Sequence, residues 1–198
     1  MKVSCLHENI SKGLSIVGRA VATRSTLPVL GNVLIKTEKS GLKLSATNLE
    51  MGITCWIGAK VHEEGSTTLP AKTFIDLVGT LPNERIDFEL DVRTQTMHVA
   101  CAEFTNEIKC IGSDEFPVLP SVDDTHDLEI NVSNLREMID QVVFAAATDD
   151  SRPVLTGVEV KIEKGQLSFA AADGFRLAVC SSSLSATDDT QIGVIIPA

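Results

Sequence analysis

An internal repeat constrains this 198-residue chain more than any other feature of its sequence. The segment 22–30 aligns with 147–155, at the shift that takes Pro28 to Pro153, and the alignment extends without a gap in both directions. About a third of the positions from Asn9 to Ala46 are identical, which is too many for a chance match. The chain therefore contains two copies of one structural unit.

Each copy begins with an apolar stripe at helical spacing. In the first copy the stripe is Ile10, Leu14, Val17 and Val21, and positions 135, 139, 142 and 146 repeat it. Residues suited to N-capping precede both stripes: Asn9; Ser133 and Asn134. Alternation of apolar and polar residues predicts strands over 33–38, 42–46, 51–61, 86–90, 96–102 and 106–111, and a stripe from Phe74 to Leu81 predicts a second helix. The expected fold class is α+β with antiparallel strands.

The repeat also sets the expected domain organisation. We predict a first domain over 1–120, a linker over 121–127 and a second domain over 128–198. The final residues, Ile196-Pro197-Ala198, match Leu69-Pro70-Ala71, which lead into the second helix of the first copy. We therefore expect the chain to be a fragment that holds one domain and the first half of another.

Composition narrows the functional classes. The chain has 17 Lys and Arg against 27 Asp and Glu, a formal net charge of −10 at pH 7, which excludes binding to nucleic acid by broad neutralisation of phosphates. No apolar run is long enough to cross a bilayer, and charged residues come too early for a signal peptide, so we expect a cytosolic protein. The five scattered cysteines lack zinc-ligand spacing and are expected to be buried structural thiols.

No catalytic motif stands out in the sequence. It has neither a Gly-rich phosphate loop nor a nucleophile elbow, and its four histidines are scattered. The acidic pairs 123–124, 149–150 and 188–189 are typical of solvated loops, because none has another ligand at matched spacing. We expect no enzyme activity, no metal and no cofactor; the alternative is a hydrolase that uses Asp149 and Asp150.

Several short motifs carry a family resemblance that covers the whole chain. They are Thr26-Leu27-Pro28-Val29-Leu30-Gly31-Asn32, Ala46-Thr47-Asn48-Leu49-Glu50-Met51, Leu69-Pro70-Ala71-Lys72, Phe116-Pro117, Arg152-Pro153-Val154-Leu155 and Ala172-Asp173-Gly174-Phe175-Arg176-Leu177-Ala178. Together they resemble the bacterial sliding clamp family, the beta subunit of DNA polymerase III. The resemblance implies the DNA-clamp fold, in which repeated helix-plus-antiparallel-strand units place helices around a hole and sheets outside.

The resemblance also implies a function. Members of this family are non-catalytic processivity factors of three domains, and a head-to-tail homodimer closes a ring around duplex DNA. A bacterial cytoplasmic, nucleoid-associated protein is therefore expected. An alternative that keeps the fold is a repeat-built protein-interaction module that does not bind DNA.

The resemblance implies sequence-independent contacts to duplex DNA. Arg24 and Lys72 match basic DNA-contacting positions of the family, Arg152 matches an arginine near the same surface, and Lys12, Arg19 and Arg136 are basic residues on predicted helices. A few such residues suffice, because tight phosphate contacts would stop the ring from sliding.

A second implied site is a hydrophobic cleft that receives short peptide motifs from the DNA polymerase III catalytic subunit, the clamp loader, other polymerases and repair proteins. Its residues in this chain are Leu155, Ala172, Gly174, Phe175, Arg176 and Leu177. Taken without the resemblance, Leu155 and Leu177 are predicted core residues and Gly174 a turn glycine. The other wall of the family's cleft lies outside this sequence, so we expect weak or absent peptide binding by this chain.

The third implied site is the ring interface. It corresponds to Thr73 and Leu77 on the second helix and to Asn106 and Ile108 on an edge strand, with Ile108 expected to be exposed. The partner surface belongs to the family's third domain, so this chain alone is not expected to close a ring.

Overall fold

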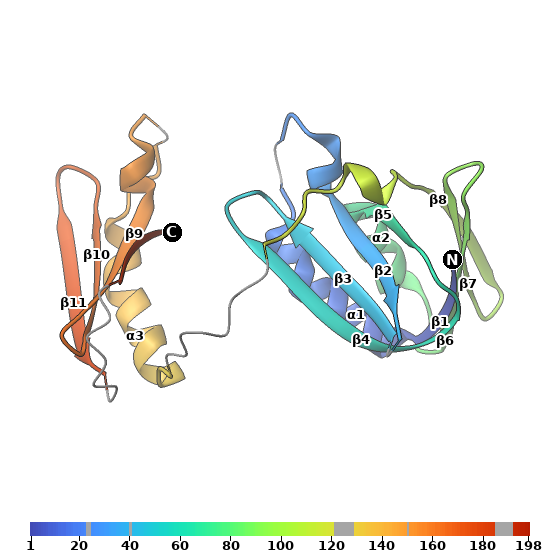
Figure 1. The fold of residues 1–198 in the computed structure, drawn as a ribbon, viewed down its shortest axis with the longest axis horizontal. Helices are drawn as coiled ribbons and strands as arrows, with labels where there is room; N and C mark the ends of the chain where they lie inside the picture. Colours follow the sequence, from blue (N-terminus) through green and yellow to red (C-terminus); the bar gives the residue numbers. More distant parts are fainter. Residues whose placement is uncertain (23–24, 40, 121–128, 150, 185–191) are drawn as a thin grey trace. The chain divides into compact units, whose positions relative to one another are not determined.

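The computed structural model describes residues 1–22, 25–39, 41–120, 129–149, 151–184 and 192–198 (Figure 1). The chain divides into two compact units: unit one is Met1–Ser121 and unit two is Val122–Ala198. Each unit is described by itself. None of the helices in the described residues is long and apolar enough to span a membrane.

Unit one is one antiparallel sheet with two helices. Its elements are β1 (Lys2–Leu6), α1 (His7–Val17), β2 (Asn32–Glu38), β3 (Gly41–Thr47), β4 (Gly52–Glu63), β5 (Ser66–Pro70), α2 (Ala71–Thr80), β6 (Arg85–Asp91), β7 (Thr96–Cys101) and β8 (Phe104–Lys109), with short 3-10 turns η1 (Gly18–Ala20), η2 (Pro28–Gly31) and η3 (Ser113–Glu115). The strand order is β5-β2-β3-β4-β1-β6-β7-β8. The long strand β4 pairs with β3 over its first half and with β1 over its second half, and so joins the two halves of the sheet.

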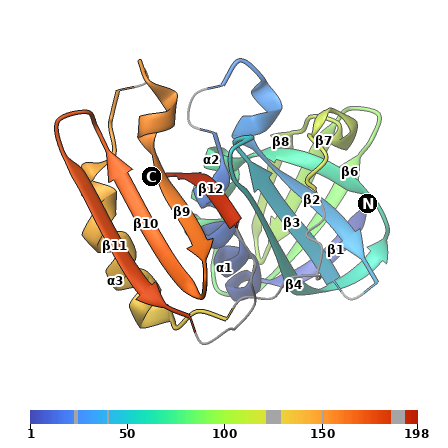
Figure 2. The same cartoon turned by 60° about the vertical axis from the view of Figure 1, so that its left-hand side comes forward.

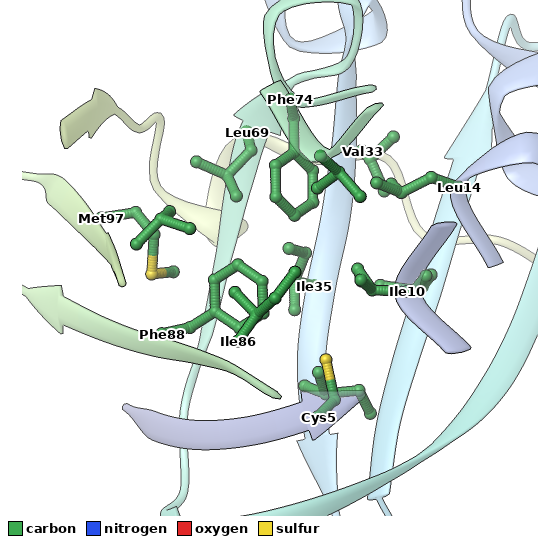
Figure 3. Packing of buried hydrophobic residues seen from close by; sticks show 14 of the residues in the cluster. Cys5, Ile10, Leu14, Val33, Ile35, Leu69, Phe74, Ile86, Phe88 and Met97 are labelled. Carbon is green, nitrogen blue, oxygen red and sulfur yellow. The ribbon is translucent and has the colours of Figure 1, made fainter. Parts of the chain in front are cut away.

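Helices α1 and α2 lie beside each other and cover one face of this sheet (Figures 1 and 2). Between helices and sheet is a continuous core, drawn in Figure 3, in which Ile10, Leu14 and Phe74 are at most 1% exposed. The rings of Phe74 and Phe88 meet edge to face, with centroids 5.8 Å apart. The apolar stripes of both predicted helices therefore face the core, as expected.

The six predicted strands of unit one are confirmed within a few residues, but two strands were not predicted. Strand β1 is only five residues long and runs straight into α1, and the sequence pattern gave the helix alone. Strand β5 carries buried threonines, Thr67 and Thr68, whose hydroxyls donate to the Ile111 carbonyl. Its polar residues are buried because they are hydrogen-bonded, which hydropathy does not reveal.

In its described residues, unit two repeats the first half of this arrangement with one α-helix and four strands. Its elements are α3 (Val132–Val142), η4 (Val143–Ala145), η5 (Pro153–Thr156), β9 (Gly157–Glu163), β10 (Gln166–Ala172), β11 (Leu177–Ser183) and β12 (Ile192–Pro197), and the sheet order is β11-β10-β9-β12. Its buried core includes Met138 and Val142 from α3 and Leu167 and Phe169 from β10.

The predicted caps are wrong at both helices. Helix α1 begins at His7 after Leu6, without a side-chain cap, and Asn9 lies inside the helix and donates to the Gly58 carbonyl at 3.3 Å. The N-cap of α3 is Asn131, two residues before the predicted Ser133.

Replacing Asn131 with alanine is expected to destabilise unit two by about 1 kcal/mol. Its side-chain oxygen accepts hydrogen bonds from the backbone N–H groups of Ser133, at 2.9 Å, and Asn134, at 3.3 Å, at the start of α3. Urea denaturation followed by circular dichroism measures the change. The control is Ser133→Ala, an exposed first-turn position, and equal stability of the two variants would contradict the capping role.

The cysteine prediction is half right. Cys5 and Cys101 are buried, whereas Cys55, Cys110 and Cys180 are half-buried, and all five are free thiols. Burial raises the pKa of Cys5 to about 12, so this thiol stays protonated and unreactive at neutral pH.

Candidate functional sites

Two loops of unit two bring the predicted cleft residues together. One loop is η5, which contains Leu155, and the other is the turn 173–176 between β10 and β11. Arg152 bridges them, because its Nη2 donates to the Asp173 carbonyl at 3.2 Å. Gly174 has a φ of +91°, and a Cβ there would lie 2.9 Å from Arg152 Nη1, so the prediction of a turn glycine is confirmed.

These loops present an exposed apolar surface. Phe175 is 98% exposed, Leu177 69% and Val154 67%, and Leu155 is half-buried. The prediction that Leu177 belongs to the core is therefore wrong, since residues of β11 alternate between exposed and half-buried and Leu177 lies on the open face of this edge strand. We call Val154, Leu155, Phe175 and Leu177 the apolar surface of unit two.

The turn that carries Phe175 is held by hydrogen bonds to Asp173. Asp173 Oδ1 accepts from the backbone N–H groups of Phe175, at 2.9 Å, and Arg176, at 3.0 Å. Asp173 Oδ2 pairs with Arg176 Nε at 2.9 Å, and the Arg176 guanidinium lies 5.7 Å from the ring centroid of Phe144. Sequence reasoning missed Phe144; the available signal is that it falls off the apolar stripe of α3, which leaves an aromatic ring without a core position.

The hydrogen bonds of this turn are expected to lower the pKa of Asp173, which an acid titration can measure. The backbone N–H groups of Phe175 and Arg176 hold the pKa of Asp173 below its usual value. A depressed carboxyl pKa contributes stability above the unfolded-state pKa, and that contribution is lost as the pH falls through the folded-state pKa. Carboxyl-carbon NMR should therefore give a midpoint below that of a free aspartate, about 3.9. The protection of the amides of 175 and 176, relative to their intrinsic exchange rate at each pH, should fall over the same pH range. An ordinary midpoint would contradict the capping geometry.

The predicted DNA-contacting residues lie mostly on helices. Lys12 is on α1, Lys72 in the first turn of α2 and Arg136 on α3, and each is exposed. Arg19 is exposed as well, but it lies in η1, because α1 ends at Val17. Within the described part of the chain, none of these four has a carboxylate within 4.0 Å.

The other two predicted DNA-contacting residues are Arg152 and Arg24. Arg152 is exposed but its guanidinium is engaged with the Asp173 carbonyl, as described above. Arg24 lies outside the described residues.

Helices α1 and α2 approach closely, since a Cβ on Gly18, just after α1, would lie 3.0 Å from Ile75 Cδ1 on α2. Lys12, Arg19 and Lys72 therefore belong to one helical layer of unit one.

The predicted ring-interface residues have different surroundings. Thr73 is exposed, and Leu77 and Asn106 are half-buried. Ile108 is only 6% exposed, so the expectation of an exposed Ile108 is wrong. It pairs with Met97 of β7, and this register points both side chains into the core. Phe104, at the other end of β8, is 55% exposed and was not predicted.

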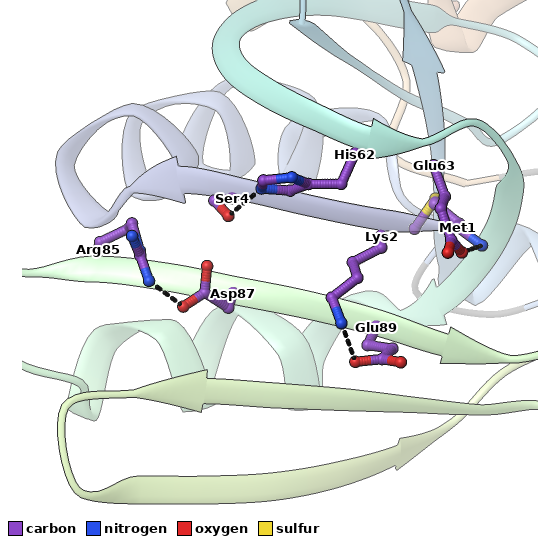
Figure 4. Close-up of polar contacts among 8 residues, drawn as sticks. All are labelled: Met1, Lys2, Ser4, His62, Glu63, Arg85, Asp87 and Glu89. Carbon is purple, nitrogen blue, oxygen red and sulfur yellow. Dashed lines mark hydrogen bonds and ion pairs between the residues drawn. The ribbon is translucent and has the colours of Figure 1, made fainter.

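A cleft of about 700 Å³, with charged and apolar side chains in its lining, lies on the strand face of unit one, across β4, β1, β6 and β7. Figure 4 shows its contacts: Ser4 Oγ lies 3.1 Å from His62 Nε2, and Arg85 Nη2 lies 2.9 Å from Asp87 Oδ2. Burial would raise the pKa of Asp87, but hydrogen bonds from Ser4 and Arg85 hold it below its usual value. The charge of His62 also lowers the pKa of Asp87, and Ser4 is 7% exposed, so these side chains form a polar cluster around a buried serine.

Asp149, the candidate for hydrolysis, has a structural role. It accepts from the Ser151 backbone N–H at 2.8 Å and from the Ser151 hydroxyl at 2.7 Å, and the hydroxyl bond holds the pKa of Asp149 below its usual value. Asp150 lies outside the described residues. In the part of the chain that the structure describes, no three His, Cys, Asp or Glu side chains are grouped to hold a metal ion.

Repeated helix-plus-strand units of this kind define the DNA-clamp class of α+β proteins. A solved sliding clamp of Bacillus subtilis matches the whole chain with a TM-score of 0.93 at 27% identity, and the DNA polymerase III subunit beta of Pseudomonas aeruginosa matches it with a TM-score of 0.90 at 31% identity. The chain covers 54% of each of these chains. The predicted fold class is confirmed.

The sequence comparisons identify the family. The N-terminal domain of the DNA polymerase III beta subunit matches residues 1–120, and its central domain matches residues 129–198. The chain therefore belongs to the DNA polymerase III beta subunit family. It is 39% identical to the beta sliding clamp of Synechocystis over 202 residues, covering 98% of this chain and 52% of that protein, and it spans about half the length of the curated relatives it matches.

Proposed function

We propose that this chain acts in a processivity factor, a ring that encircles duplex DNA and tethers the replicative polymerase. The observation that carries the proposal is the match of both units, over nearly the whole chain, to sliding clamps. In this proposal the protein is a non-catalytic accessory subunit of the bacterial cytoplasm and forms a head-to-tail homodimer. Domains over 1–120 and 128–198 with a linker over 121–127 are part of it.

The charge arrangement supports the DNA-binding part of the proposal. Three lysines of the strands are neutralised by nearby glutamates: Lys2 by Glu89, Lys43 by Glu38 and Lys161 by Glu163. The exposed basic residues of the helical layer have no such partners among the described residues. The helical layer carries Lys12, Arg19 and Lys72 against Glu8 and Asp76, so it is slightly cationic within a chain of net charge −10 and can attract phosphates without binding them tightly. Arg24, Arg136 and Arg152 are proposed to add to this attraction.

Reversing Lys12, Arg19 and Lys72 to glutamate is expected to weaken binding of a short DNA duplex at low salt by about tenfold. The slope of log K against log salt should also fall by about 0.9 for each phosphate contact that is lost. Fluorescence anisotropy over a salt series measures both quantities. The control reverses Lys36, Lys60 and Arg93, which are exposed on strands and a strand turn and change the net charge equally. Equal losses in both triple variants would instead favour a protein-interaction module without a DNA-binding face.

The apolar surface of unit two is proposed to receive peptide motifs of the polymerase catalytic subunit, the clamp loader and repair proteins. The proposed contact residues are Leu155, Ala172, Gly174, Phe175, Arg176 and Leu177. An exposed aromatic ring with an arginine at its rim has the character of a peptide-binding hot spot. The fixed turn beneath Phe175 lowers the entropy that binding would cost.

The ring interface is proposed to use Thr73, Leu77 and Asn106. Because Ile108 is buried, the exposed ring of Phe104 is the apolar side chain of β8 that a partner subunit would meet. An edge strand with free backbone groups and one exposed aromatic residue suits pairing with another strand.

A further inference from the structure

The loop pair of unit two has a counterpart in unit one. At equivalent positions, Asp173 Oδ1 caps the backbone N–H groups of residues 175 and 176, and Asn48 Oδ1 caps those of residues 50 and 51, at 3.0 and 2.8 Å. Gly174 has a φ of +91° and Leu49 a φ of +76°. The turn of unit one is thus built like the turn of unit two.

The adjoining 3-10 turns also correspond. The Ala147 N–H donates to the Leu155 carbonyl at 2.8 Å, and the Ala22 N–H donates to the Leu30 carbonyl at 3.0 Å. Unit one also exposes apolar residues here, since Leu27 is 49% exposed, Leu49 62% and Met51 43%. We call the turn 48–52 together with η2 the paired turns of unit one.

One position differs in an informative way. Leu177, the first residue of β11, is exposed in unit two, and its counterpart in unit one is Gly52. A Cβ on Gly52 would lie 2.9 Å from Leu119 Cδ2, so the side chain of Leu119 fills the space beside this glycine. A leucine from a distant segment therefore lies where unit two carries its own leucine.

The residues that precede Leu119 in the chain are hydrogen-bonded to strand β5. Ile111 exchanges backbone hydrogen bonds with Thr68 of β5, at 3.0 and 3.2 Å, and Ser113 Oγ lies 2.7 Å from Ser66 Oγ. Phe116 is 7% exposed, whereas Val118, between Phe116 and Leu119, is 95% exposed. The segment 113–119 therefore starts with the 3-10 turn η3 and contacts unit one through Ser113 and Leu119, with Phe116 buried between them.

We propose that the paired turns of unit one are a second peptide-docking surface, and that the segment 113–119 is its built-in occupant. The ligand class is a peptide that presents a leucine side chain to the space beside Gly52. A partner peptide with such a leucine would bind to the paired turns of unit one when the segment 113–119 dissociates from them. That last step rests on the peptide-binding role proposed for unit two, whose loops share this construction. The covalently attached segment outcompetes a free peptide because its effective concentration is high.

The test uses the full chain and a fluorescent peptide with the sequence of residues 113–120. Leu119→Ala should accelerate amide exchange at residues 50 and 51 by about tenfold, since the covering side chain is lost. Val118→Ala is the matched control, because the exposed Val118 covers nothing, and it should leave these amides unchanged. The labelled peptide should bind the Leu119→Ala variant and not the unaltered chain.

A second variant identifies where the peptide binds. Adding Gly52→Leu to Leu119→Ala should abolish peptide binding, because the new side chain fills the space beside position 52. The proposal is overturned if Leu119→Ala leaves exchange at 50 and 51 unchanged, or if the peptide binds the unaltered chain equally well. It is also overturned if binding is lost with Leu177→Ala and not with Gly52→Leu, an outcome that would support the peptide role of unit two alone.

Discussion

Replacing Phe74 with alanine is expected to destabilise unit one by about 3–5 kcal/mol. The side chain is fully buried between α2 and the sheet, and its ring lies edge to face against Phe88 of β6. Truncation removes this contact and leaves a cavity between elements far apart in the chain. A loss of this size is a large part of the free energy of unfolding of an ordinary domain, about 5–15 kcal/mol, so the urea midpoint of unit one should fall markedly.

The single tryptophan makes the measurement specific to unit one. Trp56 is on β4, with its Nε1 donating to Glu38 at 3.0 Å and its ring 5.3 Å from the Lys43 ammonium. Tryptophan fluorescence during urea denaturation therefore reports on unit one. The control is Phe175→Ala in unit two, where the ring is 98% exposed and the change should stay within about 0.5 kcal/mol. A Phe74→Ala midpoint equal to that of the unaltered chain would contradict the packing described here.

The repeat predicted most of the fold because both copies carry the same periodic patterns. Strand β1 could not be predicted from periodicity. Its partners are residues 59–63 and 85–89, and a strand of five residues is stable only because it pairs with them. The threonines of strand β5 can be buried because they donate hydrogen bonds to the carbonyl of Ile111, a residue more than forty positions away. In both strands, contacts remote in sequence decide the structure.

Exposure at the candidate sites was less predictable than the elements themselves. Ile108 and Leu177 are both aliphatic residues on edge strands, yet one is buried and the other exposed. The difference is the surroundings of each side chain. Ile108 lies in the core of unit one through its pairing with Met97, whereas Leu177 begins a strand that has one exposed face among the described residues. Turn residues were more predictable, because Gly174 needs a positive φ whatever surrounds it.

The peptide-binding role proposed for unit two predicts that the double variant Phe175→Ala, Leu177→Ala loses any measurable binding of a peptide motif from the DNA polymerase III catalytic subunit. Central aromatic and aliphatic anchors of peptide sites each contribute about 2 kcal/mol or more, which is about thirtyfold in affinity. Both side chains are already exposed, so their truncation removes contacts with the peptide and leaves the core of unit two intact. NMR titration is the suitable measurement, since it detects the weak binding expected of this chain.

A matched control distinguishes binding at a specific site from non-specific binding to exposed apolar side chains. Val132 is 79% exposed on α3, in the same unit but away from the 172–177 turn, and Val132→Ala should leave the titration unchanged. A peptide attracted to any exposed apolar side chain would respond to both variants, whereas one seated beside the capped turn responds only to the first. Undiminished binding by the double variant would place the peptide site elsewhere on the chain, and the shared construction of the two loop pairs would then have to be explained by folding alone.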